Sequence, residues 1–260
     1  MEQQIRHTLL FGILFSLVTT AVGGSIEDRA AKIHARHKDA VITVKLVTRQ
    51  RMVVSGKEMD QGEHKQEVTG VIIDPSGLAV VSLFVTDPWA NSSPAFGGED
   101  NPDFSFETEI SDVKMLMPGS DEVQARVLIR DRDLDLVFIS PTDSTGKSFP
   151  FIDFSNSAKA TVLNECILLG RLGKAAGRTA SVTLCRVKAI VNKPRRFYIP
   201  DGTAIFDGLG RPAFTQNGKT LGILLMRVIP SPKGEFNETP IILPAEDIIE
   251  VMGQIPERDQ

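Results

Sequence analysis

Short runs that alternate between apolar and polar residues fill most of the chain after residue 40. A period of two residues is typical of strands that bury one face in a core. Turn-forming sequences separate the runs, among them DPSG at 74–77 and NG at 217–218. The predicted strands are 41–47, 66–73, 78–84, 113–117, 125–129 and 136–139, then 166–169, 181–190, 197–199, 213–215, 221–228 and 241–243.

Helices are predicted at the two ends of this strand-rich region. Ser25 and Asp28 form a capping-box pattern, which opens a helix that runs to about residue 38. A second helix begins after Pro244 and runs to about residue 255. The polar stretch 142–148 divides the strands into two sets of six. The pattern predicts an all-β fold of two six-stranded antiparallel β-barrels, with a short N-terminal helix and the first barrel in 25–145 and the second barrel and a C-terminal helix in 146–260.

Residues 1–24 have the pattern of a secretory signal peptide. Arg6 precedes an apolar run from 9 to 22, and small residues follow at 23–25. The run is short for a transmembrane helix, and no later stretch approaches that length. We therefore expect export to the periplasm or the extracellular space, with no membrane contact after cleavage. An uncleaved anchor is the alternative.

Composition narrows the classes of ligand. The net charge is −4 and only 6% of the residues are aromatic, so neither duplex nor single-stranded nucleic acid is an expected partner. His34 and His37 lie three residues apart on the predicted first helix but lack an obvious third ligand. No metal site is predicted, and no cofactor is expected.

Five segments, in order, resemble the trypsin-like protease domain of the HtrA (Deg) family. The first is TGVIIDPSGLAVVSLFV at 69–85, which is similar to the family's G-x-G-V-I-I-D-x-x-G-x-I-V-T-N-x-H-V. The others are ARVLIRDRDLDLVFI at 125–139, the strands at 166–170 and 181–184, DGLGRPA with GKTLGI within 207–223, and ILPAEDIIEV at 242–251. The resemblance extends over about residues 39–255 and implies the family's double barrel. It leaves no room for the PDZ domain that usually follows.

The resemblance also implies that the family's catalytic residues are mostly lost. A member uses a Ser nucleophile, a His general base and an Asp that orients the His. Matched by motif, the His position falls on Phe84, the Asp position on Asp135 and the Ser position on Leu209. Phe84 cannot accept a proton and Leu209 offers no nucleophile, so peptidase activity by this route is not expected. The histidines after residue 24 all precede the strand that would carry the base, and no serine lies between residues 181 and 231.

The segment that matches the nucleophile turn also departs from the family pattern. Gly208 and Gly210 flank Leu209, and Arg211 replaces the glycine beside the family's proline. Together with Phe84, these residues are predicted to form a vestigial cleft that apolar side chains fill.

The two cysteines, Cys166 and Cys185, are equally distant from the centre of the predicted hairpin loop 173–178. They face each other if the strands pair about that centre, and export permits a disulfide between them. A shift of one residue would put them on opposite faces, and two buried free thiols are the alternative.

These observations favour an exported HtrA-like homologue without catalysis, which binds a peptide or a protein. Strand addition at a barrel edge is the natural mode for this fold. Two alternatives stay open at this point: an active serine-type endopeptidase that uses non-standard residues, and an unrelated β-barrel binding protein. The oligomeric state does not follow from the sequence.

Overall fold

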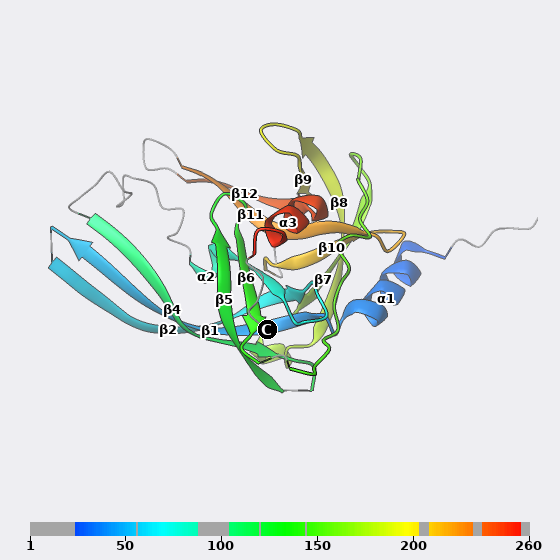
Figure 1. Ribbon diagram of the computed structural model, residues 1–260. Helices are drawn as coiled ribbons and strands as arrows, with labels where there is room; N and C mark the ends of the chain where they lie inside the picture. Colours follow the sequence, from blue (N-terminus) through cyan, green and yellow to red (C-terminus); the bar gives the residue numbers. More distant parts are fainter. Residues whose placement is uncertain are drawn as a thin grey trace, which may run out of the picture.

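The computed structural model describes residues 24–55, 57–87, 104–119, 121–143, 145–202, 208–230 and 236–255. It contains two closed antiparallel barrels of six strands each, in the orders β1-β2-β3-β6-β5-β4 and β10-β11-β12-β9-β8-β7 (Figure 1). The predicted fold class is therefore confirmed. The predicted signal peptide falls on residues outside the described ranges, apart from its last residue.

The first barrel buries alternate residues of each strand in its interior. On β1, for example, Ile42, Val44 and Leu46 are at most 1% exposed and share one apolar cluster with Val81 and Val137. The period of two along the sequence is thus the period of this core. The strands are β1 (Val41–Val54), β2 (Lys57–Ile72), β3 (Ala79–Ser82), β4 (Phe104–Leu116), β5 (Glu122–Asp131) and β6 (Leu136–Pro141).

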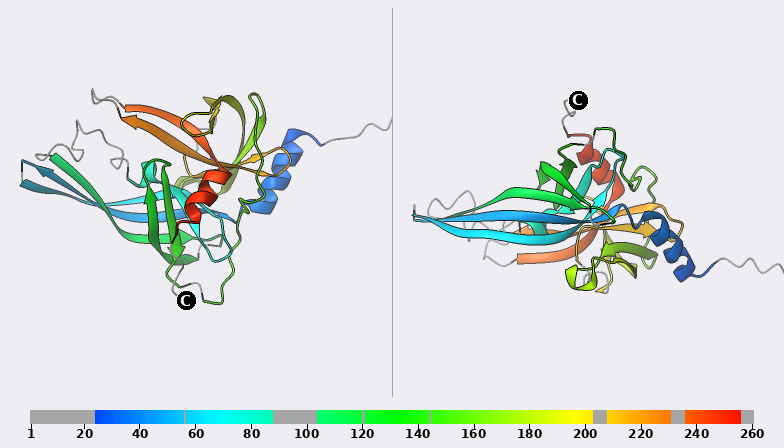
Figure 2. Two further views of the ribbon diagram at one scale, coloured as in Figure 1. Left: turned by 45° about the horizontal axis from the view of Figure 1, so that its top comes forward. Right: turned by 90° about the horizontal axis from the view of Figure 1, so that it is seen from below.

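Three strands of this barrel are much longer than the pattern predicts. The runs at 41–47, 66–73 and 113–117 give no sign that β1 continues to Val54, that β2 begins at Lys57 or that β4 begins at Phe104. The outer segments are mostly polar, so they lack the alternation that marks a half-buried strand. They are strands because β1 pairs with both β2 and β4 as far as Val54. The outer parts of the three strands (48–54, 57–65 and 104–110), here called the arm, project from the barrel (Figure 1, Figure 2).

The third strand ends earlier than predicted. The expected strand 78–84 stops at Ser82, and the next residues form a single helical turn, α2 (Leu83–Thr86). The Leu83 amide donates to the Asp135 carbonyl at 3.1 Å, and the Thr86 hydroxyl donates to the Leu83 carbonyl at 3.0 Å. These bonds replace ladder pairing, and the turn carries Phe84 toward the core cluster of the second barrel.

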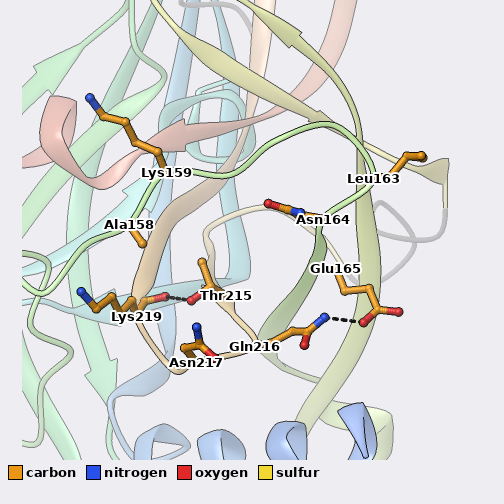
Figure 3. A pocket seen from close by; sticks show the side chains of 9 residues that line it. All are labelled: Ala158, Lys159, Leu163, Asn164, Glu165, Thr215, Gln216, Asn217 and Lys219. Carbon is orange, nitrogen blue, oxygen red and sulfur yellow. Dashed lines mark hydrogen bonds between the residues drawn. The ribbon is translucent and has the colours of Figure 1, made fainter.

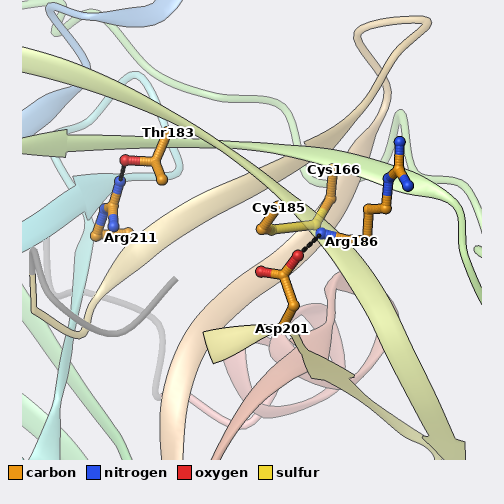
Figure 4. Close-up of a disulfide and its surroundings, with 6 residues drawn as sticks. All are labelled: Cys166, Thr183, Cys185, Arg186, Asp201 and Arg211. Atoms are coloured by element: carbon orange, nitrogen blue, oxygen red, sulfur yellow. Dashed lines mark hydrogen bonds between the residues drawn. A yellow bond between two sulfur atoms is a disulfide. The ribbon is translucent and has the colours of Figure 1, made fainter. Parts of the chain in front are cut away.

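A disulfide reinforces the hydrogen-bonded pairing of two adjacent strands, β7 and β8, in the second barrel. Cys166 on β7 and Cys185 on β8 are directly opposite, their Cα atoms are 5.2 Å apart, and a disulfide joins them (Figure 4). Both are buried. The elements are β7 (Glu165–Arg171), η2 (Lys174–Ala176), β8 (Ala180–Val191), β9 (Phe197–Pro200), β10 (Arg211–Thr215), β11 (Thr220–Pro230) and β12 (Phe236–Pro244).

The helix α1 (Ile26–His37) covers part of the outer surface of the second barrel. Its N-terminus has the predicted capping box, and its buried face includes Ile33. The ring of His37 stacks on Phe214 of β10 with centroids 5.1 Å apart. The Arg29 guanidinium donates to the Gln216 side chain at 2.6 Å, so polar and apolar contacts both hold the helix in place.

The helix α3 (Ala245–Met252) follows β12 directly and helps to join the barrels. Its buried Ile248 and Val251 share one apolar cluster with Val80 and Phe138 of the first barrel and Ile223 of the second. No helix in the described part of the chain is long and apolar enough to cross a membrane.

Candidate functional site

Asp135 lies between the two barrels, in the turn from β5 to β6. It has a left-handed φ of +60° and is only 2% exposed. One carboxylate oxygen accepts the Phe84 amide, and the other accepts the Ser82 hydroxyl and the Met226 amide, each at 2.8 Å. Ser82 and Phe84 belong to the first barrel and Met226 to β11 of the second. A single carboxylate therefore ties main-chain groups of both barrels together.

The environment of this carboxyl shifts its titration. Burial raises the pKa of Asp135 from 3.8 to about 7, against the hydrogen bonds from Met226, Phe84 and Ser82, which lower it. The neighbouring phenyl ring supplies no positive charge to offset the burial. The group therefore changes its charge near neutral pH.

Phe84 and Leu209 lie close to this junction. Leu209 is 6% exposed and belongs to the core cluster of the second barrel, and the half-buried Phe84 packs against the same cluster. Both residues, with Gly208, line a cavity of about 480 Å³. The structure thus brings together the residues that the sequence matched to the base, the aspartate and the nucleophile of a protease.

Both barrels contribute walls to this cavity, here called the cleft. Val68, Thr69 and Val85 come from the first barrel, and Leu172 and Gly173 from the second. The cleft is not completely filled, although Phe84 and Leu209 narrow it. Among the described residues, those that line it include threonines but no serine, cysteine or histidine.

Gly210 fixes the turn that follows Leu209. Its φ is +80°, and a Cβ atom there would lie 2.3 Å from the carbonyl oxygen of Thr69. Its amide donates to the Leu224 carbonyl at 2.8 Å. Only glycine tolerates both the backbone conformation and the close approach of β2. Gly210 acts here through its backbone and does not line the cleft.

Arg211, expected in the vestigial cleft, points elsewhere. Its side chain is fully buried, packs against Gly170 and donates to the Thr183 hydroxyl at 2.7 Å (Figure 4). It does not line the cleft. The sequence placed Arg211 close to Leu209 correctly, but β10 begins only at Arg211, and the left-handed turn at Gly210 separates the two side chains.

No sequence motif marks two further cavities. One, of about 620 Å³, is lined by Arg227, Val228 and Ile229 of β11 and, on another side, by the β5–β6 turn. The other, of about 520 Å³, lies between the loop before β7 and the β10–β11 turn, where Gln216 donates to Glu165 at 2.6 Å (Figure 3). Each is formed by segments far apart in sequence, so no local pattern could reveal it. No three His, Cys, Asp or Glu side chains gather as a metal site within the described ranges.

Two six-stranded barrels with a buried aspartate at their junction define the trypsin-like double-barrel fold. Solved structures support this. The chain is similar to an HtrA-type protease, AlgW, solved with a tripeptide, with a TM-score of 0.56 and 16% identity over 89% of this chain and 64% of that one. It is also similar to Deg5, with a TM-score of 0.56 and 13% identity over 87% of this chain and 93% of that one.

The chain thus spans less than two thirds of the AlgW chain. No protein-family model and no curated protein matches the sequence. At these identities the likeness establishes an HtrA-type fold.

Proposed function

We propose that this protein is a non-catalytic homologue of HtrA-type proteases, which binds an extended peptide or protein segment in the cleft. The observation that carries the proposal is the hydrogen bond from the Phe84 amide to the Asp135 carboxylate. It fixes Phe84 beside the carboxylate that would orient a general base, and a phenyl ring has no nitrogen to accept a proton. Leu209, which lines the same cleft, offers no nucleophile.

An active endopeptidase would need another nucleophile and base at this junction. Ser82 and Asp135 form a hydroxyl–carboxylate pair there, and a carboxyl with a pKa of about 7 has the strength of a base. However, Ser82 is 0% and Asp135 2% exposed, and neither lines the cleft. A peptide bond held in the cleft would not reach the Ser82 hydroxyl. The pair therefore favours a structural role.

An open edge of β11 supports strand addition as the binding mode. Among the described strands, β10 accompanies β11 only as far as Leu224, while β12 covers the other edge. The Asp135 carboxylate accepts a hydrogen bond from the Met226 amide. The next three residues of β11, 227–229, border the cavity of about 620 Å³. Ile229 is 51% exposed there. An added strand would gain main-chain hydrogen bonds, and every second side chain could contact the cavity.

We also propose that the protein acts outside the cytoplasm. Residues 1–24 carry the signal-peptide pattern, and the disulfide suits an oxidising compartment. N-terminal sequencing of the protein recovered from a producing cell tests this. Mature protein beginning near residue 24 outside the cytoplasm would support cleavage, whereas an intact N-terminus in the membrane fraction would support the anchor.

A peptidase assay tests the absence of catalysis. Purified protein is incubated with unfolded casein and with a fluorophosphonate probe, beside a Phe84→His, Leu209→Ser double variant. We expect neither turnover nor labelling of the unaltered protein, and labelling of the double variant would support the assignment of both positions. Turnover by the unaltered protein that survives repurification would overturn the proposal.

A displayed library of random peptides of about 12 residues, long enough to pair as an extended strand, tests binding. Enriched peptides are expected to lose affinity for Leu172→Glu, which places a charge in the wall of the cleft. Leu163→Glu is the matched control, because this residue is 71% exposed and lines a cavity that shares no residue with the cleft. Failure to enrich any peptide, or equal loss in the two variants, would overturn binding in the cleft.

A further inference from the structure

We propose that the bound segment continues beyond the cleft, along the outer edge of β2 and onto the arm. There it pairs with main-chain groups of Lys65 and Glu63. The inference rests on the proposed function, because it extends a segment that first lies in the cleft. The occupant is an extended stretch of a partner polypeptide.

Hydrogen bonds at the inner end of β2 determine which main-chain groups face this edge. The Ile72 amide donates to the Ala40 carbonyl on the β1 side at 2.9 Å, and the Ile73 amide donates to the Leu78 carbonyl on the β3 side at 2.8 Å. In an antiparallel ladder, successive residues direct these groups to opposite edges. The β1–β2 register is unbroken from Val71 to Glu63. Even-numbered residues of this stretch therefore face β1, and odd-numbered ones face away from it.

The outward groups of β2 lose their strand partner close to the cleft. β3 pairs only with residues 70–72, and none of the other described strands follows this edge. The Thr69 carbonyl is packed against Gly210, so the edge begins beside the nucleophile turn. Glu67, Lys65 and Glu63 come next, and each offers an N–H and a C=O group.

Two cavities border the unpaired edge of β2. Glu67 and Gln66 line both the cleft and a neighbouring cavity of about 360 Å³, which also includes Lys65 and Val47. The second cavity extends from β2 across β1 to β4, so a segment that leaves the cleft along the edge of β2 borders it on one side. Because Glu67 and Gln66 line both cavities, the unpaired edge of β2 begins at the cleft and is continuous with it.

Side chains already occupy part of the opposite edge of the arm. On β4, the Thr108 carbonyl accepts the Arg130 guanidinium at 3.3 Å, and the Thr108 hydroxyl donates to Asp87 at 2.8 Å. The exposed Lys65 and Glu63 of β2 have no ion-pair partner in the described part of the chain. The edge of β2 is thus the more available one.

The charges along β2 indicate the chemistry of the partner. Lys65 and Glu63 are two residues apart, so their side chains lie on the same face of the sheet. Charged edge residues discourage unselective pairing. A segment with an acid opposite Lys65 and a base opposite Glu63 would gain cross-strand ion pairs instead. We expect a partner that is apolar beside Phe84 and Leu209 and alternately charged beyond them.

Two substitutions at one position test the pairing. Lys65→Pro removes the outward N–H but leaves the pairs that His64 and Gln66 make with β1, and edge strands tolerate proline. Lys65→Ala is the matched control, because it removes the charge and keeps the N–H. The probe is the tightest peptide of about 12 residues from the library, together with its cleft-binding half. Lys65→Pro is expected to weaken the whole peptide about fivefold relative to Lys65→Ala and to leave the half unchanged.

The outcomes separate this inference from the proposed function. Equal affinity of the two variants for the whole peptide, or equal affinity of the unaltered protein for the peptide and its half, would overturn the inference alone. Failure of every peptide to bind would overturn both. Hydrogen exchange can be measured on the unaltered protein, so this test does not depend on the folding of a variant. The Lys65 amide is expected to exchange more slowly with the whole peptide bound, but not with the half. Unchanged exchange of this amide would contradict the pairing.

Discussion

Replacement of Asp135 by asparagine is expected to destabilise the protein in acid and to stabilise it above neutral pH. The carboxylate accepts the Phe84 amide on one oxygen and the Met226 amide on the other. An asparagine side chain has one oxygen and one NH₂ group, so in either orientation one of these buried amides faces a donor. A buried amide without an acceptor costs about 1–3 kcal/mol. This cost does not depend on pH.

The unaltered carboxyl carries a different cost, which does depend on pH. Its pKa is raised from 3.8 to about 7 on folding, so the folded state holds the proton more tightly than the unfolded state. Its contribution to stability is therefore full below about pH 4 and is lost as the pH rises toward 7. A shift of about three units corresponds to about 4 kcal/mol. Asparagine has no proton to lose, so the variant is expected to become the more stable protein above about pH 7.

Denaturant unfolding of both proteins between about pH 4 and pH 8 measures this difference. Subtracting the free energies of unfolding of the two proteins at each pH removes the contribution of all other titrating groups. Asp133→Asn, at an exposed neighbouring position, serves as the control. A variant that is destabilised equally at every pH, or more at high pH, would refute the reasoning. It would mean that the three hydrogen bonds outweigh burial and keep Asp135 charged.

Three further predictions test contacts that hold the fold together. Gly210→Ala is expected to lower the free energy of unfolding by more than about 2 kcal/mol, because the new Cβ would lie 2.3 Å from a carbonyl oxygen. Gly208→Ala is the control: its φ is +91° but the space around it is open, so the same denaturant assay should show a loss of about 1 kcal/mol. Replacement of Cys166 and its partner by alanine should lower the free energy of unfolding by about 3 kcal/mol, since the bond closes a loop with a sequence separation of 19; unchanged stability would contradict this. Arg29→Ala should release α1 to limited proteolysis and lower stability by about 1 kcal/mol, while Lys32→Ala, on the exposed side of the helix, should do neither.

The alternation of apolar residues was sufficient to predict both barrels, because their interiors are built from it. The same signal missed the arm, where Arg49, Gln50 and Arg51 follow one another without an apolar stripe. These residues form a strand through pairing with β4, whose partner residues are more than 50 positions away in sequence. The end of β3 was also missed, since the bond that stops it comes from the main chain of Asp135.

The site was located from the order of the motifs, with no single residue to mark it. Phe84 and Leu209 are ordinary core residues by type, and only their places within longer segments matched them to the base and nucleophile positions of a protease. Sequence reasoning could not find the Met226 amide, because a main-chain donor has no residue signature. It also placed Arg211 in the cleft, because the direction of the chain after the left-handed turn at Gly210 is set by the pairing of β10, which the motif does not show.

The hydrogen bonds of Asp135 bear on how homologous chains should be compared. A residue without a side-chain oxygen at position 135 would leave three donors from two barrels without an acceptor, whether or not any substrate is cut. Natural selection could therefore keep an acceptor at this position whether or not the chain has a catalytic base and nucleophile. In this architecture, an aspartate at the junction of the barrels does not by itself indicate catalytic activity.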